Sequence, residues 1–190
     1  MTPAEALADA FAGTAREDFL PEHQRRFAGM DRALPIGWGQ TNSQPSTVRS
    51  MLRLLDVRPG QEILDVGCGS GWTTALLARL VGPTGHVVGV EIVPELVTFG
   101  RANLATQQLP QARIEQAEPG VLGLPDEAPY DRILVSAEAH TVPLPLVEQL
   151  RVGGVLVVPV AGWMNEVRRT DTEPSVVRRG GYSFVPLVGG

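Results

Sequence analysis

Short, largely apolar runs alternate along this chain with longer stretches of helix-forming residues. The clearest apolar runs lie at 62–66, 87–91, 131–136 and 155–160, with a weaker one at 112–116. Helical patterns occur at 3–12, 45–55, 73–81, 94–108 and 143–150, and Pro45 suits a first helical turn. Strands that alternate with helices predict an α/β domain with a mainly parallel sheet and helices on both faces.

Two parts of the chain depart from this alternation. Residues 29–46 are rich in Gly, Pro, Asn and Ser and predict a long ordered loop, a feature that is more often functional than idle. The tail has strand-like pieces at 164–170, 175–178 and 182–187. A length of 190 residues predicts a single domain, 1–190.

The first strong strand runs directly into a glycine-rich turn. Gly67, Gly69 and Gly71 occupy alternate positions before the helical pattern begins, so a ligand can approach bare backbone amides at a helix N-terminus. Glu91 ends the next strand, at the roughly 20-residue spacing expected of a carboxylate that accepts hydrogen bonds from ribose hydroxyls. The pattern predicts a nucleoside-containing cofactor.

The residues around these glycines favour one cofactor over another. A dinucleotide site needs a small residue where this chain has Trp72, and Asp65 at the strand end would repel a phosphate. The same carboxylate suits the sulfonium and ammonium groups of S-adenosylmethionine. NAD and a tight turn without a ligand are the alternatives.

Composition and charge exclude several classes of protein. The chain is 43% hydrophobic and 19% charged, as soluble globular proteins are. Its net charge of −5 includes no basic block, which argues against nucleic-acid binding. Cys68 is the only cysteine, so no intrachain disulfide can form. We expect no membrane span, no signal peptide, no metal site and a cytoplasmic location.

Four segments, in order, carry a resemblance to a known family. They are R-E-D-F-L-P at 16–21, L-P-I-G-W-G-Q-T-N-S-Q-P at 34–45, D-V-G-C-G-S-G-W at 65–72 and F-V-P-L at 184–187. Together they resemble the protein-L-isoaspartate O-methyltransferases. The G-Q-T-x-S-Q-P segment is specific to that family, whereas many methyltransferases share the glycine loop.

The resemblance implies a fold, an activity and a mode of action. The fold would be the class I, Rossmann-like methyltransferase fold, with one antiparallel strand near the C-terminus and a variant order of the last strands. N-terminal helices and a substrate loop would occupy 1–58, the cofactor-binding core 59–160, and C-terminal strands 161–190. The activity would be S-adenosylmethionine-dependent methylation of L-isoaspartyl carboxylates in peptides or proteins, a repair reaction through an ester and a succinimide. The partner would be a damaged peptide or protein, and the enzyme a monomer.

The resemblance also assigns roles to residues. Ser43 would lie beside the transferred methyl group with Thr41 close by, although a serine here also suits a helix N-cap. The cofactor would be bound by Asp65, Gly67, Cys68, Gly69, Ser70, Gly71, Glu91, Ile92, Glu118 and Gly120. The substrate would meet Gln40, Asn42, Glu138, His140, Val185, Pro186 and Leu187, the last three by strand addition or, alternatively, as an edge strand of the core.

Some positions depart from the family pattern. Pro119 stands where the family has an aspartate near the adenine, and Glu118 is the neighbouring substitute. Glu138 and His140 stand where the family has alanine and proline, and Asn42 replaces an apolar residue. These departures leave two alternatives open: a carboxyl methyltransferase dedicated to one peptide, and a cofactor-binding module without turnover. An NAD-dependent oxidoreductase is weaker still, because Trp72 disfavours it.

Overall fold

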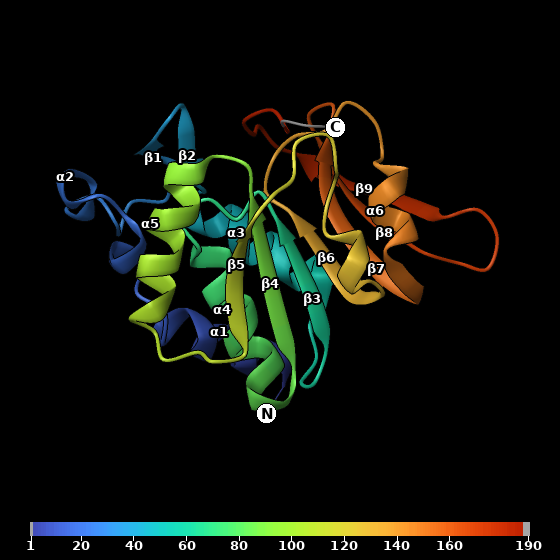
Figure 1. Cartoon of the computed structure of the whole chain (residues 1–190), viewed down its shortest axis with the longest axis horizontal. Helices are drawn as coiled ribbons and strands as arrows, with labels where there is room; N and C mark the ends of the chain where they lie inside the picture. Colours follow the sequence, from blue (N-terminus) through green and yellow to red (C-terminus); the bar gives the residue numbers. More distant parts are fainter. Residues whose placement is uncertain (1, 188–190) are drawn as a thin grey trace.

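A seven-stranded sheet organises the computed structural model, which describes residues 2–187 (Figure 1). Its strands lie in the order β5-β4-β3-β6-β7-β8-β9. Their bounds are β3 Glu62–Val66, β4 His86–Glu91, β5 Ala112–Gln116, β6 Tyr130–Val135, β7 Leu150–Val160, β8 Trp163–Arg168 and β9 Ser175–Gly181. The helices are α1 Pro3–Ala12, α2 Glu22–Arg25, α3 Pro45–Leu55, α4 Trp72–Val81, α5 Pro94–Ala105 and α6 Leu144–Glu148. Short 3-10 turns are η1 Arg16–Phe19, η2 Gly82–Thr84 and η3 Pro125–Glu127.

The sheet is mainly parallel. Strands β3 to β7 pair in parallel, whereas β8 runs antiparallel to both of its neighbours, β7 and β9. One strand near the C-terminus therefore runs against the rest, as predicted. The last three strands lie side by side in chain order.

Alternation along the strands divides the core between the two faces of the sheet. On β3, Ile63 packs into a cluster with residues of α1, α3, α4 and α5, whereas Leu64 packs on the other side with Leu146 and Val147 of α6. Helices thus cover both faces, although the second face carries one short helix and the loop after β5 (Figure 1).

Two predictions for irregular segments were wrong. The expected loop 29–46 contains a hairpin, β1 Leu34–Gly37 and β2 Gln40–Asn42. Its tight turn is made possible by positive φ angles at Gly37, Trp38 and Gly39. The expected strand at 182–187 is reduced to one bridge between Pro186 and Glu138.

The boundaries of two other elements also moved. Strand β7 begins at Leu150 and continues through Gly153 and Gly154, five residues before the predicted start at 155. Helix α5 ends at Ala105, short of the predicted 108. No helix among the described residues is long and apolar enough to cross a bilayer.

Strand β4 presses closely on the glycine loop at Gly89. A Cβ there would lie 2.8 Å from Thr74 Oγ1 and 2.9 Å from Cys68 Sγ. We expect Gly89→Ala to lower the free energy of unfolding by about 1–3 kcal/mol through overpacking. Urea denaturation checks this, with Gly29→Ala as the control because a Cβ at Gly29 would meet nothing within 4 Å. Equal shifts in the two variants would contradict it.

Candidate active site

A cavity lies at the carboxyl ends of β3, β4 and β6, where open α/β sheets bind ligands. It encloses about 660 Å³, including the part that is open to solvent. Its walls come from distant parts of the chain: Gln40, Thr41, Val66, Gly67, Gly69, Val90, Glu91, Ile92, Ala117, Val121, Leu122, Gly123, Ser136, Ala137, Val185, Pro186 and Leu187. Six of the predicted cofactor and loop residues therefore meet there: Gln40, Thr41, Gly67, Gly69, Glu91 and Ile92.

The glycine loop is held in a shape that only small residues allow. Gly67 and Gly69 have φ angles of 71° and 53°, in the left-handed region. The backbone N–H of Gly67 donates to the carbonyl of Val90 (2.9 Å), which ties the loop to β4. A Cβ on Gly100 of α5 would lie 2.9 Å from the Gly69 carbonyl oxygen, so α5 packs directly against the loop. Gly71 lines neither the cavity nor its neighbours and instead caps α4.

Glu91 fixes the edge of the cavity. Its Oε2 accepts from the Gly69 N–H (2.9 Å), and its Oε1 accepts from the N–H groups of Ile92 (2.8 Å) and Val93 (3.0 Å). The residue is buried, with 6% exposure, yet it lines the cavity. Because a carboxylate has about four acceptor sites, Glu91 keeps capacity for ligand hydroxyls.

Asp65 is a buried carboxylate below the loop. Its Oδ2 accepts from the hydroxyls of Thr73 (2.6 Å) and Thr74 (2.7 Å) of α4. Within residues 2–187, its Oδ1 has no hydrogen-bond partner. Burial raises the pKa of Asp65 to about 6, while the two hydroxyls act in the opposite direction. An unsatisfied buried carboxylate of this kind favours a cation nearby.

A smaller hollow of about 310 Å³ adjoins the main cavity. It is lined by Thr41, Asn42, Ser43, Gly67, Cys68, Gly69, Ser70, Trp72, Thr73 and Ser136. Thr41, Gly67, Gly69 and Ser136 line both spaces, so the hydroxyl residues Thr41 and Ser136 lie where the two meet, and Ser43 lines the smaller hollow. The hollow also includes the predicted Cys68 and Ser70.

Ser43 does not cap helix α3. The N-cap residue is Gln44, and the N–H of Ser46 in the first turn donates to Asp31 Oδ1 (2.8 Å). Asp31 therefore accepts from the helix N-terminus, which is the capping role that the alternative interpretation gave to Ser43. Ser43 lines the smaller hollow without a capping role, which favours a functional role for its hydroxyl.

Asn42 is tied into the protein. It is buried, its Oδ1 accepts from Arg16 Nε (2.7 Å), and its Nδ2 donates to Ser70 Oγ (3.1 Å). Although the residue lines the smaller hollow, these bonds favour a positioning role over the predicted substrate contact.

The tail closes one side of the cavity. Val185 accepts from the Glu138 N–H and Leu187 donates to the Glu138 carbonyl, both at 2.8 Å. Because neighbouring residues of an extended chain point their backbone groups to opposite sides, only the Pro186 carbonyl is directed away from Glu138. Proline has no N–H, so this pairing favours the edge-strand alternative over addition of a substrate strand at these residues.

The predicted residues of the adenine side lie elsewhere. Glu118 is exposed and lines neither cavity, and Gly120 belongs to a neighbouring groove. The cavity wall comes instead from Ala117 and Val121 on either side of them. The chain turns at this point, with the Val121 N–H donating to the Glu118 carbonyl (3.0 Å), and the predicted contact of Glu118 with the adenine stays a prediction.

Glu138 and His140 are separated. His140 is exposed and lines the neighbouring groove, together with Val142 and Leu144, whereas the half-buried Glu138 lines neither the cavity nor the hollow. The sequence analysis missed Ser136 and Ala137, which line the cavity just after β6. Their position directly after a strand that pairs with β3 was the available signal.

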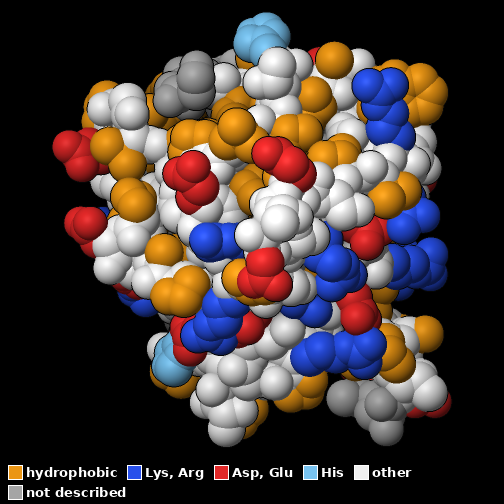
Figure 2. All heavy atoms as spheres, turned by 90° about the vertical axis from the view of Figure 1, so that its right-hand side faces the viewer, with side chains coloured by type: hydrophobic (Ala, Val, Ile, Leu, Met, Phe, Trp, Pro, Cys, Tyr) orange, Lys and Arg blue, Asp and Glu red, His pale blue; other side chains and the backbone are white. Residues whose placement is uncertain are grey.

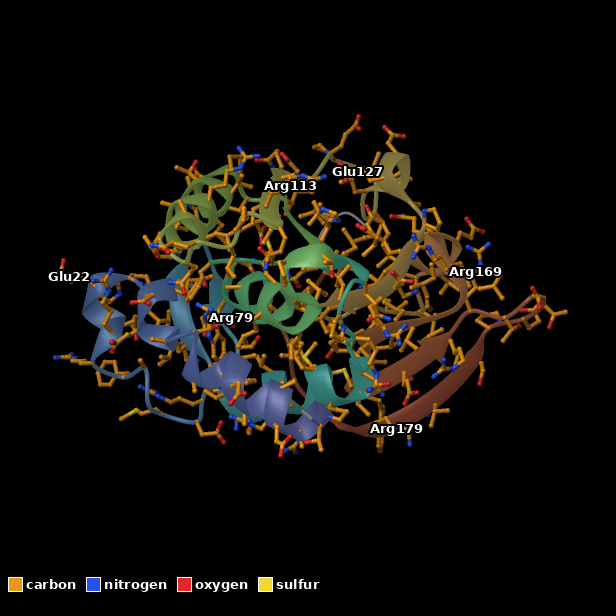
Figure 3. The ribbon with its side chains drawn as sticks, turned by 90° about the horizontal axis from the view of Figure 1, so that it is seen from below. Glu22, Arg79, Arg113, Glu127, Arg169 and Arg179 are labelled. Carbon is orange, nitrogen blue, oxygen red and sulfur yellow. The ribbon has the colours of Figure 1, made fainter. Side chains whose placement is uncertain are left out.

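Ion pairs hold the loop that follows β5. The Arg113 guanidinium donates to the Glu127 carboxylate of η3, and Figure 3 shows the two side chains turned toward one another. This pair fastens the segment 117–128, whose residues Val121, Leu122 and Gly123 form a wall of the cavity.

Arginines gather on the face that presents β8 and β9, but acidic groups are interspersed among them (Figure 2). Arg179 pairs with Glu166 (2.7 Å), and Arg168 and Arg169 donate to the backbone carbonyls of Gly153 and Glu148. The face therefore has mixed charge. Among the residues that the structure describes, no three His, Cys, Asp or Glu side chains gather as a metal site.

Comparison with known proteins identifies relatives over the whole chain. Residues 1–190 match the family model described as protein-L-isoaspartate(D-aspartate) O-methyltransferase. A protein-L-isoaspartate O-methyltransferase from Methanothrix thermoacetophila is 44% identical over 97% of this chain and 89% of its own. Its counterpart from Methanopyrus kandleri is 45% identical over 96% of this chain and 83% of its own.

Solved structures share the fold. A protein-L-isoaspartate O-methyltransferase superposes with a TM-score of 0.89 at 25% identity, over 98% of this chain and 62% of that one. A Plasmodium falciparum protein, described as a putative member of the same group in complex with S-adenosyl-L-homocysteine, gives a TM-score of 0.86 at 24% identity, over 98% of this chain and 91% of its own. The class I methyltransferase fold is thus shared across the chain.

Proposed function

Since the chain belongs to the protein-L-isoaspartate(D-aspartate) O-methyltransferase family, we propose that it transfers the methyl group of S-adenosylmethionine to the carboxylate of L-isoaspartyl residues in peptides and proteins. One observation carries the proposal: the cofactor cavity adjoins a hollow whose lining includes five hydroxyl residues, among them Thr41, Ser43 and Ser136. The resulting methyl ester carries a better leaving group than the free carboxylate does. The neighbouring backbone nitrogen attacks the ester carbonyl, methanol leaves, and the succinimide that forms hydrolyses partly to aspartate.

The residues present fit this cofactor. Glu91 has acceptor capacity left for ribose hydroxyls, and Gly67 and Gly69 keep the loop free of side chains. Asp65 has an unpartnered oxygen among the described residues, so its charge favours an ammonium or sulfonium group. A phosphate would be repelled by the same carboxylate, and Trp72, which is buried against Phe11 of α1, fills the place of the small residue in a dinucleotide site.

The chain's own residues align the reactants. When bound, S-adenosylmethionine supplies an electrophilic methyl group, and a carboxylate oxygen can accept it without proton transfer. The hydroxyls of Thr41, Ser43 and Ser136 can donate to the substrate carboxylate and orient one oxygen toward that methyl group. The mostly buried walls exclude water from the junction.

Glu138 supports a second candidate within the same class. Its carboxylate follows directly after the cavity residue Ala137, although it lines neither space, and a negative charge near the cavity disfavours an isoaspartyl carboxylate. This suits an enzyme dedicated to one peptide with a compensating cation. We further propose that the protein acts as a monomer in the cytoplasm and without nucleic acid. The mixed charge of the β8–β9 face is the observation that supports the last point (Figure 2).

The test compares two peptides that differ only in their linkage. We expect methyl transfer from labelled S-adenosylmethionine to a short L-isoaspartyl peptide and none to its normal aspartyl counterpart. Similar turnover on several unrelated isoaspartyl peptides would exclude the dedicated enzyme. Calorimetric binding of the cofactor without transfer to any of them would overturn the proposed activity and favour a binding module.

Ser43→Ala tests the role of the hydroxyl. A hydrogen bond to a charged group contributes about 1.5–3 kcal/mol, so we expect kcat/KM for the isoaspartyl peptide to fall by about 10- to 100-fold. The melting temperature should stay unchanged, because Asp31 caps the helix. Ser46→Ala, one turn away and exposed, is the control. A loss confined to protein stability would show that Ser43 is structural.

A further inference from the structure

Arg16 holds together the segment that leads into the active site. It lies in η1 and is 7% exposed. Its guanidinium donates to three carbonyls of the loop before β1: Ala28 (3.3 Å), Met30 (2.9 Å) and Arg32 (2.8 Å). Its Nη2 also donates to the carbonyls of Asn42 (3.1 Å) and Ser43 (2.9 Å). Burial lowers the pKa of Arg16 to about 10, so the group stays charged at neutral pH, with carbonyl dipoles around it.

Asn42 extends this arrangement to the cofactor loop. Arg16 Nε donates to Asn42 Oδ1 (2.7 Å), and Asn42 Nδ2 donates to Ser70 Oγ (3.1 Å). The Ser70 carbonyl in turn accepts from Asn103 Nδ2 of α5 (3.0 Å). Arg16, Asn42, Ser70 and Asn103 thus form one buried chain of hydrogen bonds, which we call the Arg16 relay.

The Arg16 relay joins the two halves of the reaction centre. Asn42 lies between Thr41 and Ser43, and Ser70 lies between Gly69 and Gly71. Residues 41–43 and 67–70 both line the smaller hollow. The bond from Asn42 to Ser70 therefore sets the separation between the hydroxyls that face the substrate and the loop that faces the cofactor. An apolar residue at position 42 cannot make this bond.

We propose that Asn42, held by Arg16, is a positioning residue that fixes the distance between substrate and methyl donor. The proposal rests on the proposed methyl transfer. Neither side chain touches the reacting atoms, so loss of the relay changes the alignment of the reactants and leaves the binding of the cofactor intact. Alignment errors of about 1 Å reduce rates by up to about 100-fold.

The experiment breaks the same bond from both sides. Asn42→Leu, Ser70→Ala and the double variant are compared with the original protein. We expect each single variant to lower kcat by about tenfold. The double variant should lower it no further than Asn42→Leu alone, since the Asn42–Ser70 bond is absent in all three and Asn42→Leu also removes the bond from Arg16 Nε. The Kd for S-adenosylmethionine, from calorimetry, should stay within about twofold. Asn165→Leu, a buried asparagine of β8 whose Nδ2 donates to Trp163, is the matched control and should change stability alone.

Three outcomes would overturn the proposal. If the loss of kcat in the double variant equalled the product of the two single losses, the two residues would act separately. A weaker Kd in Ser70→Ala would make Ser70 a direct cofactor contact, and an unchanged kcat would make the relay structural. Hydrogen exchange of the segment 40–47 gives a readout without turnover: it should become faster in both single variants and not in Asn165→Leu. This result separates failure of the relay from failure of the proposed reaction.

Discussion

Glu91→Ala is expected to weaken the binding of S-adenosylmethionine by about 100- to 1,000-fold. One ribose hydroxyl would lose a charged acceptor, at about 1.5–3 kcal/mol, since three of the about four acceptor sites of Glu91 are taken by backbone N–H groups. The glycine loop would also lose its fastening, because the Gly69 N–H donates to Glu91 Oε2 (2.9 Å). Titration calorimetry on the cofactor-free protein measures the change in Kd directly.

Two further variants make this prediction specific. Glu91→Gln keeps an acceptor without the charge and should lose about tenfold in affinity. Glu95→Ala removes the same charge from the exposed first turn of α5 and should bind as the original protein does. If Glu91→Ala bound within about threefold of the original, the ribose would have to lie elsewhere.

Asp65→Asn is expected to change both cofactor affinity and the dependence of stability on pH. Removing a buried negative charge near a cationic ligand should weaken S-adenosylmethionine binding at pH 8 by about tenfold or more. The original protein should itself bind more weakly as the pH falls below about 6, where Asp65 becomes protonated. Calorimetry between pH 5 and pH 8 tests both statements.

The sign of the stability effect follows from the raised pKa. Burial lifts the pKa of Asp65 from 3.8 to about 6 in the folded, cofactor-free protein. The stability that its proton confers is complete below the unfolded value of 3.8 and is lost as the pH rises through about 6, a change of about 3 kcal/mol. Asp65→Asn does not titrate, so its stability relative to the original protein should rise across this window. Exposed Asp9→Asn is the control, and parallel pH profiles for Asp65→Asn and the original protein would contradict the argument.

Local signals decided which elements could be predicted. Strand β3, its glycine turn and α4 form a continuous pattern of an apolar run, three alternate glycines and a helical run, and the prediction was confirmed there. The hairpin at 34–42 was missed because its strands have four and three residues, too few for alternation to be distinguished from a loop. The start of β7 was misplaced because Gly153 and Gly154 suggest a break, whereas the strand runs through them.

Some residues of the candidate site could likewise be predicted from local signals, and others could not. Asp65 and Glu91 follow from their positions at strand ends. The structure places Glu91 in the cavity wall, whereas Asp65 is fully buried and lines neither the cavity nor the hollow. The Arg16 relay could not be predicted from spacing, because Arg16, Asn42 and Ser70 come from distant parts of the chain and are joined only through tertiary packing. Glu118 shows how far alignment with a motif can be trusted. The residue matches the motif position, but a turn of the chain leaves it outside the cavity lining.

The cavity brings together segments that are far apart in the sequence, residues 40–41 and residues 185–187. Gln40 and Thr41 face the same space as Val185, Pro186 and Leu187, and the tail is fastened there by Glu138. A chain still emerging from the ribosome has the glycine loop long before it has this wall. Synthesis therefore delivers a cofactor-binding core first and a closed reaction chamber only when residues 185–187 dock. We expect a nascent molecule that still lacks these residues not to methylate the unfolded segments that surround it.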